Sequence, residues 1–134
     1  MQILIATIRD AEFFAFSQAL AREVEKAELL FTDNWTNLLA AVKVMAPAFV
    51  ILDQGLPEGS PLELARKLIM VNAMINIIVV TDLAGERFHE ASEGLGILAP
   101  LPEHPTAQDG EKLAEVLKVF LGGNGAALPE NPES

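Results

Sequence analysis

The sequence contains no cysteine, which excludes disulfide bonds, thiolate metal ligands and a cysteine nucleophile. It has only two histidines, His89 and His104, in separate predicted elements, so it argues against a histidine-rich zinc site. Basic residues are also few: 9 Lys and Arg stand against 19 Asp and Glu, for a formal charge of −10. A chain with so few cations is poorly suited to a phosphate backbone, and we expect no nucleic-acid partner.

Long apolar runs are missing as well. No run reaches the roughly 18 residues that a membrane span needs. The first residues enter a strand-like run without the basic segment of a signal peptide. We therefore expect a cytoplasmic protein with no membrane partner. Apolar residues nonetheless make up 51% of the 134 residues, which suits one domain with one folded core.

The strongest structural signal lies in the segment Pro47–Pro61. Four apolar residues, Phe49 to Leu52, run without a break into the carboxylate of Asp53. An uninterrupted run of this length is typical of a strand buried on both faces. The glycines and prolines that follow predict a loop; they are Gly55, Pro57, Gly59 and Pro61. Asp53 is thus predicted at the carboxyl end of a central strand, where open α/β sheets place their chemistry.

Apolar runs alternate with helical periodicity along the rest of the chain. Strands are predicted at residues 3–6, 27–31, 49–53, 77–81 and 97–99. Helices are predicted at residues 11–23, 35–46, from 61 onwards, 85–95 and 107–121. The expected helix caps are Asp10, then Asp33 or Asn34, and Ser60, with Pro61 at the first helical position.

Five strands alternating with five helices predict an α/β fold with right-handed crossovers. The expected architecture is the flavodoxin-like three-layer sandwich, a five-stranded parallel sheet in the order 2-1-3-4-5. Residues 1–121 would form this domain. The pair Gly122-Gly123 is interpreted as a helix stop, and residues 122–134 as a flexible tail or linker.

Several motifs share their order and spacing with the receiver domain of bacterial response regulators, which the chain resembles from residue 2 to the end of the last predicted helix. Pro47–Asp53 resembles the family's phosphoacceptor strand, Val79–Thr81 its fourth strand, and Gly94–Pro102 the segment that ends in Lys-Pro. The resemblance implies a signalling module of a two-component (phosphorelay) pathway. Its partner would be a histidine kinase or an output protein, with a homodimer as a further option.

The resemblance places the phosphoacceptor at Asp53 and the phosphoryl-binding hydroxyl at Thr81. The remaining pocket positions depart from the family pattern; they are Thr7 and Ile8 for the acidic pair, Arg9 beside them, Asp82 for a small residue and Leu101 for the lysine. Ile8 cannot coordinate magnesium, and Leu101 cannot contact a phosphoryl oxygen. Asp53 alone would hold Mg²⁺ poorly, so we expect no metal site, no cofactor and no catalysis.

Three functions are compatible with this pattern. The first is a pseudo-receiver that acts through protein–protein interaction without Mg²⁺-dependent phosphorylation. The second is a divergent receiver that is still phosphorylated on Asp53. The third, a flavodoxin-like small-molecule binder, ranks last because no Ser/Thr/Gly-rich phosphate loop follows Ile5. The expected interaction face comprises the fourth helix, fifth strand and fifth helix, with Phe88 and with Leu98, which replaces the family's switch aromatic.

Simpler roles exist for the same polar residues. Asp53 can cap the following loop, Thr81 can satisfy the end of its strand, and Asp82 can cap the helix that starts near Gly85. For Arg9, the simpler interpretation is a solvated side chain at a helix start. The alternative is a guanidinium that replaces the missing cation at Asp53 and fixes one conformation.

Overall fold

Five parallel strands form the sheet that the apolar runs predict. The computed structural model describes residues 1–83 and 85–125. The strands are β1 (Gln2–Ala6), β2 (Glu28–Thr32), β3 (Phe49–Leu52), β4 (Asn76–Val80) and β5 (Ile97–Leu101). Their order, β2-β1-β3-β4-β5, and their parallel pairing confirm the predicted flavodoxin-like fold.

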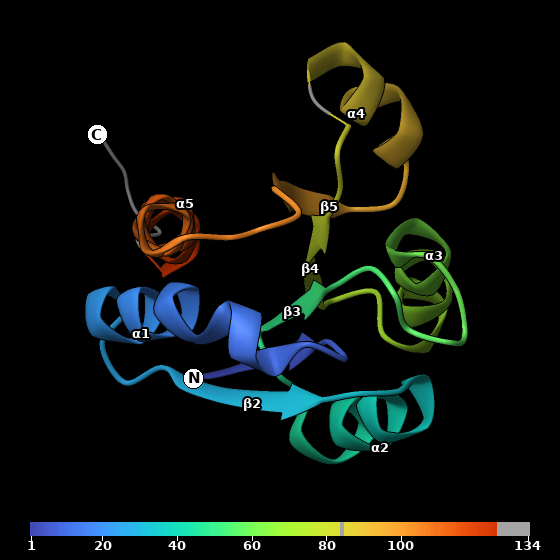
Figure 1. The fold of residues 1–134 in the computed structure, drawn as a ribbon, viewed down its shortest axis with the longest axis horizontal. Coiled ribbons are helices and arrows are strands. Elements are labelled where there is room, and N and C mark those ends of the chain that lie inside the picture. The colour runs from blue at the N-terminus through green and yellow to red at the C-terminus, as the bar shows by residue number, and fades with distance from the viewer. Residues whose placement is uncertain (84, 126–134) are drawn as a thin grey trace.

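The helices cover both faces of this sheet. They are α1 (Phe14–Glu23), α2 (Trp35–Met45), α3 (Pro61–Val71), α4 (Gly85–Ser92) and α5 (Ala107–Gly125), and a 3-10 helix, η1 (Asp10–Phe13), precedes α1. Figure 1 shows α1 and α5 on one side of the sheet and α2 and α3 on the other, with α4 projecting beyond β5. The layers are those of the predicted three-layer sandwich.

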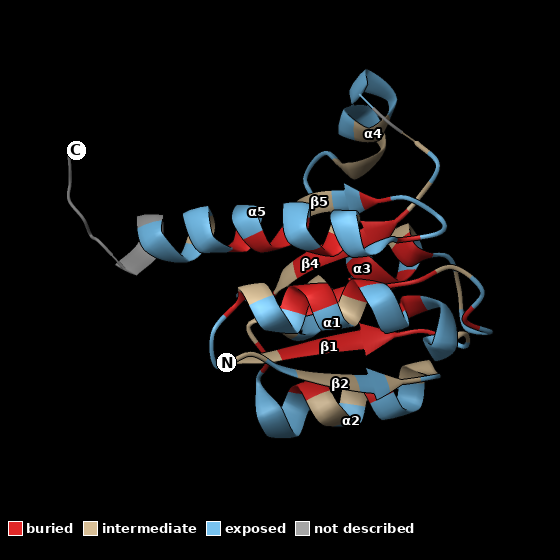
Figure 2. Cartoon of the chain, turned by 60° about the vertical axis from the view of Figure 1, so that its left-hand side comes forward, coloured by how far each residue is buried: buried red, intermediate tan, exposed pale blue. Residues whose placement is uncertain are grey.

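Each face of the sheet carries its own apolar core, because successive strand residues point to opposite sides. Ile3 and Ile5 of β1 pack with Phe16 on the α1–α5 side. Leu4 and Ala6 of the same strand pack on the α2–α3 side. Apart from the first residues of β1 and β4, Gln2 and Asn76, the central strands are therefore buried, as the red segments of β1 and β4 in Figure 2 show. This double burial explains why β3 is an unbroken apolar run.

The first helix begins differently from the prediction. Asp10 was expected to cap an α-helix; instead it is the first residue of η1, and the residue before it, Arg9, makes no side-chain capping bond. The other predicted caps are confirmed. Asn34 Oδ1 accepts a hydrogen bond of 2.8 Å from the Asn37 amide. Ser60 and Glu63 form a reciprocal capping box at the start of α3.

The last helix is longer than predicted. It continues to Gly125, so the expectation that Gly122-Gly123 stops it is wrong. Glycine weakens a helix by only about 1 kcal/mol and does not forbid it, since its backbone can adopt helical angles and donate its N–H. Residues 126–134 of the predicted tail lie outside the described residues.

The fifth strand and fourth helix also differ from their predictions. β5 extends to Leu101 and includes Pro100, which an edge strand tolerates. A register shift between Ile77 and Ile78 marks a bulge against β5. α4 ends at Ser92 and contains no buried residue.

Among the described residues, no helix has the length and apolar character needed to cross a membrane.

Gly110 provides a test of the contact between α1 and α5. A Cβ atom at this position would lie 2.5 Å from the Phe16 carbonyl oxygen and 3.1 Å from the Ala19 Cβ. We expect Gly110→Ala to push the helices apart and to lower the free energy of unfolding by about 1–3 kcal/mol, measured by urea denaturation.

Gly122→Ala is the matched control, because a Cβ there meets nothing within 4 Å. Because α5 continues through residue 122, we expect this variant to gain up to about 1 kcal/mol of stability from helix propensity. An unchanged or lower stability would contradict the helical assignment of Gly122. Equal effects of the two substitutions would contradict the close contact at Gly110.

Candidate functional site

Asp53 lies where the carboxyl ends of β1 and β3 meet. Its backbone N–H donates a hydrogen bond of 2.9 Å to the Ala6 carbonyl, which continues the pairing of the two strands by one residue. The residue is fully buried, with 0% of its surface exposed. Thr7, the first residue after β1, is buried beside it at 3%. A buried carboxylate requires bonded partners, because transfer of an unpaired charge from water is costly.

Arg9 supplies the main partner of this carboxylate. Its Nε donates to Asp53 Oδ2 over 2.8 Å, and its Nη2 donates to Asp53 Oδ1 over 2.9 Å. The Thr7 hydroxyl donates to Asp53 Oδ2 over 2.6 Å. Both carboxylate oxygens are therefore engaged by a fork of two parallel, charge-assisted bonds, which are stronger than bonds between neutral groups.

The turn after β1 directs Arg9 toward Asp53. The Arg9 backbone N–H donates to the Thr7 hydroxyl oxygen over 3.0 Å, so the Thr7 hydroxyl bonds both to the main chain of Arg9 and to the Asp53 carboxylate. Ile8, between them, points outward and is 58% exposed. Gly55, with φ of +90°, turns the chain after β3. A Cβ atom on Gly55 would lie 3.2 Å from Ile8 Cδ1, so the glycine also leaves space for that side chain.

Further contacts hold the guanidinium of Arg9 in place. Its Nη1 lies 3.3 Å from Glu12 Oε1, and its Nη2 also donates to the Glu103 carbonyl in the loop before α5. The guanidinium carbon lies 5.6 Å from the centroid of the Phe13 ring. The hydrogen bonds to Asp53 raise the pKa of Arg9, against the opposing effect of its partial burial.

Arg9 is thus not the solvated arginine that the simpler interpretation expected. Its side chain is 22% exposed and contacts three segments of the chain, at residues 12, 53 and 103. The alternative role for Asp53 as a loop cap is also not what the structure contains, because both of its oxygens bind Thr7 and Arg9. The alternative interpretation expected a guanidinium next to Asp53, and the structure contains this contact; the replacement of a cation stays a prediction.

The residues around Asp53 do not fit a magnesium ion. Mg²⁺ requires oxygen ligands in octahedral geometry, usually with one or two carboxylates. Here Thr7 and Ile8 supply no carboxylate, and a positively charged side chain contacts both Asp53 oxygens. Within residues 1–83 and 85–125, no group of three or more His, Cys, Asp or Glu side chains is arranged to hold a metal.

Thr81 and its neighbours lie around a separate hollow of about 550 Å³. The Thr81 hydroxyl accepts a hydrogen bond of 3.1 Å from the Leu83 amide, the structural role that was one of its two interpretations. Leu101, at the position of the family's lysine, is 5% exposed and packs in the α1–α5 core. Its carbonyl accepts from the Thr81 amide. Asp82 is exposed and lines the same hollow.

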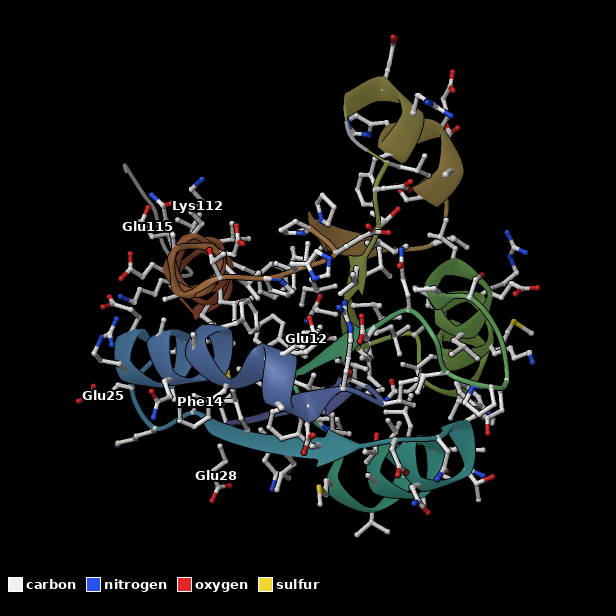
Figure 3. All side chains as sticks on the ribbon, viewed as in Figure 1. Glu12, Phe14, Glu25, Glu28, Lys112 and Glu115 are labelled. Atoms are coloured by element: carbon white, nitrogen blue, oxygen red, sulfur yellow. The ribbon has the colours of Figure 1, made fainter. Side chains whose placement is uncertain are left out.

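Phe88 and Leu98 do not form one continuous apolar surface. Phe88 is half-buried against the α2–α3 core, whereas Leu98 is half-buried against the α1–α5 core. The side chain of Leu98 therefore contributes to the fold as well as to the predicted interaction face. The acidic residues of α4 and α5 are largely exposed, and Figure 3 labels Glu115 and Lys112 on α5. The face as a binding surface stays a prediction.

Comparison with solved structures identifies the fold. No protein-family model matches the sequence, and no curated protein sequence matches it. A LuxR-family DNA-binding response regulator from Staphylococcus aureus superposes with a TM-score of 0.68 at 21% identity, over 88% of this chain and 96% of the other. A LuxR-family two-component response regulator from Aurantimonas gives 0.73 at 15% identity, over 91% and 85%. The chain has the receiver fold.

A third receiver structure comes from Salmonella enterica serovar Typhimurium. The isolated receiver domain of RcsB, determined with the phosphomimetic BeF3−, matches at a TM-score of 0.69 and 21% identity over 88% of each chain. All three likenesses are below 25% identity, so they show the fold that the sequence motifs predict. The chemistry around Asp53 rests on this chain's own side chains.

Sequence reasoning identified Asp53, Thr7 and Arg9 but missed three partners of Arg9. Glu12 follows Arg9 by three residues, a spacing typical of ion pairs in a helical turn, so the sequence did contain this signal. Phe13 was recognised only as a core residue. The Glu103 carbonyl could not be predicted from the sequence, because it lies 94 residues away and every residue type has a main-chain carbonyl.

A double-mutant cycle tests the Arg9–Asp53 pair. Arg9→Ala leaves a buried carboxylate with Thr7 as its remaining partner, and we expect the free energy of unfolding to fall by about 3–5 kcal/mol. Arg9→Ala combined with Asp53→Asn should lose clearly less than the sum of the two single variants, because the double variant contains no uncompensated charge. Arg9→Lys keeps the charge but loses the two-bond fork, so its free energy of unfolding should lie between those of the wild type and Arg9→Ala. Additive losses in urea denaturation would contradict the coupling.

Proposed function

We propose that this chain is a pseudo-receiver: a protein-interaction module of a two-component type pathway that works without Mg²⁺-dependent phosphorylation. The observation that carries the proposal is the fork from Arg9 to both oxygens of Asp53. The family chemistry requires an aspartate oxygen that attacks a phosphoryl group. In this chain both oxygens are engaged, and the side chain that engages them also bonds to Glu12 and to the Glu103 carbonyl.

Charge compensation around Asp53 supports the same function. Phosphoryl transfer depends on cations that stabilise charge on the equatorial oxygens. Arg9 brings a positive charge, but its Nε and Nη2 both donate to the Asp53 carboxylate itself. Leu101 supplies no charge from the other side, and it is buried. Freeing Asp53 would cost the Arg9 hydrogen bonds before any bond to phosphorus formed.

The bonding of Asp53 to Arg9 and Thr7 has a consequence for signalling. A conformational equilibrium shifts only when a ligand binds one state better than the other. If no phosphoryl group binds near Thr81, the chain stays in one arrangement and recognises its partner constitutively. The partner we propose is a protein, either a histidine kinase or an output protein, with a second copy of the chain as another option. We propose no catalytic role.

The second candidate is a divergent receiver that is phosphorylated on Asp53. It is favoured by the presence of both an aspartate and a threonine at the carboxyl edge of the sheet, with a hollow beside Thr81. This function requires Arg9 to leave Asp53 during the reaction. No comparable observation favours the small-molecule binder.

Acetyl phosphate distinguishes the two candidates. With Mg²⁺ present, we expect the intact mass of the wild-type chain to stay unchanged, because the Asp53 oxygens are occupied by Arg9 and Thr7. A receiver domain that accepts phosphate from this donor serves as the positive control. A phosphate adduct that forms on the wild-type chain and is lost in Asp53→Asn would establish the divergent receiver and overturn the pseudo-receiver.

Metal titration gives an independent test. We expect no saturable binding of Mg²⁺ or Mn²⁺ at concentrations below about 1 mM, because the residues at positions 7 and 8 carry no carboxylate. Amide chemical shifts around Asp53 and the fluorescence of Trp35 report the binding. Arg9→Ala is the matched variant. Saturable metal binding that appears only when the guanidinium is removed would indicate that Arg9 and the metal compete for Asp53. Saturable metal binding to the wild type would contradict the expectation.

A further inference from the structure

The edge of the sheet formed by α1 and β2 carries an apolar hollow outside the Asp53 site. It has a volume of about 520 Å³, and its apolar lining includes Phe14 and Ala21 of α1 and Leu29 and Phe31 of β2. Phe14 is 62% exposed and Phe31 is 41% exposed. A second hollow of about 360 Å³ adjoins it beyond Phe31 and includes Ile8, which is 58% exposed. Exposed aromatic side chains gathered around a concave surface indicate a binding site.

The main chain of β2 is available along this edge. β2 is the first strand of the sheet and pairs only with β1. Its inward bonds run from the Glu28 amide to the Met1 carbonyl and from the Thr7 amide to the Thr32 carbonyl, each 2.8 Å. Since parallel pairing uses alternate residues, the main-chain groups of Leu29 and Phe31 point away from the sheet. No proline or lysine lies in Glu28–Thr32 to block another strand.

Charge around the hollows differs between the two ends of β2. At the carboxyl end, Asp10 and Asp33 line the hollows, and in the described part of the chain neither forms an ion pair. Glu25 and Glu28 lie near the other end, where Figure 3 labels them together with Phe14. That end also has Lys26, whose carbonyl accepts a bond from the N-terminal amine. Asp10 and Asp33 therefore place negative charge on the lining of the hollows themselves, at the Thr32 end of β2.

We propose that this edge binds an extended segment of a partner protein, which adds to the sheet as a strand next to β2. Its apolar side chain occupies the space between Phe14 and Phe31, and a lysine or arginine beside it lies near Asp10 and Asp33. Main-chain bonds to Leu29 and Phe31 supply affinity, and the apolar and basic side chains supply specificity. A second copy of the chain is disfavoured as the occupant, because each copy has a formal charge of −10.

This inference rests on the proposed function in one respect, that the chain acts by binding proteins. It places the contact on α1 and β2 instead of on α4, β5 and α5. The two proposals can fail separately. Peptide binding to the β2 edge does not depend on the state of Asp53, and modification by acetyl phosphate does not depend on the β2 edge.

The test uses a fluorescein-labelled synthetic peptide, Lys-Thr-Val-Thr-Phe-Thr-Val-Thr-Lys, and its counterpart with glutamate at both ends. Anisotropy should show saturable binding of the lysine peptide and at least about tenfold weaker binding of the glutamate peptide. Phe14→Glu and Asp10→Lys should each weaken the lysine peptide by a similar factor. Met70→Glu, on an α3 side chain that is 85% exposed, is the matched control and should leave the affinity unchanged.

Hydrogen exchange distinguishes strand addition from general adhesion. In the complex, the amides of Leu29 and Phe31 should become protected, whereas amides of α4 and β5 should not change. The proposal is overturned if the lysine peptide does not saturate, if Met70→Glu weakens it as much as Phe14→Glu, or if protection appears on α4 and β5. A dimer that forms without peptide and dissociates in Phe14→Glu would assign the edge to a second copy and overturn it as well.

Discussion

A fully buried carboxylate constrains the whole carboxyl edge of this sheet. Asp53 follows the central strand β3, where parallel topology places it out of reach of bulk water. Without a partner, that charge would cost several kcal/mol. The chain satisfies it with a threonine and an arginine from the turn after β1. The turn after β1, the 3-10 start of the first helix and the loop before α5 each contact Arg9, through Thr7, Glu12 and the Glu103 carbonyl.

A cation that is covalently part of the chain differs from a bound metal ion. A metal that occupies such a pocket leaves and returns, and its ligands reorganise with it. A guanidinium on a short turn stays at a high local concentration, because the backbone already holds it next to its carboxylate. The pair does not need to add much net stability over an apolar replacement. Its main effect is to select a single arrangement of the three segments that it joins.

The fold could be predicted from the sequence because its signals are local. The run Phe49–Leu52 indicates a doubly buried strand, and Asn34 and Ser60 mark helix starts through bonds to residues three positions away. The sequence left alternatives open, or led to a wrong prediction, where the outcome depends on a distant partner or on a small energy difference. The direction of the Arg9 side chain depends on Asp53, 44 residues away, and the continuation of α5 past Gly122 depends on a cost of only about 1 kcal/mol. The bulge between β4 and β5, which places Leu98 and Ala99 on the same side of the sheet, was not indicated by any residue type.

The sequence separations within the Arg9 cluster have a consequence for the kinetics of folding. Arg9 bonds to residues 44 and 94 positions away, so its contacts cannot form until β1, β3 and the β5–α5 loop have assembled. Contacts between such distant segments close late, since the chain must first give up the entropy of large loops. Interactions that are absent from the transition state slow unfolding without accelerating folding. We therefore expect the contacts of the Arg9 guanidinium to lower the unfolding rate more than they raise the folding rate, so that they prolong the lifetime of the folded chain.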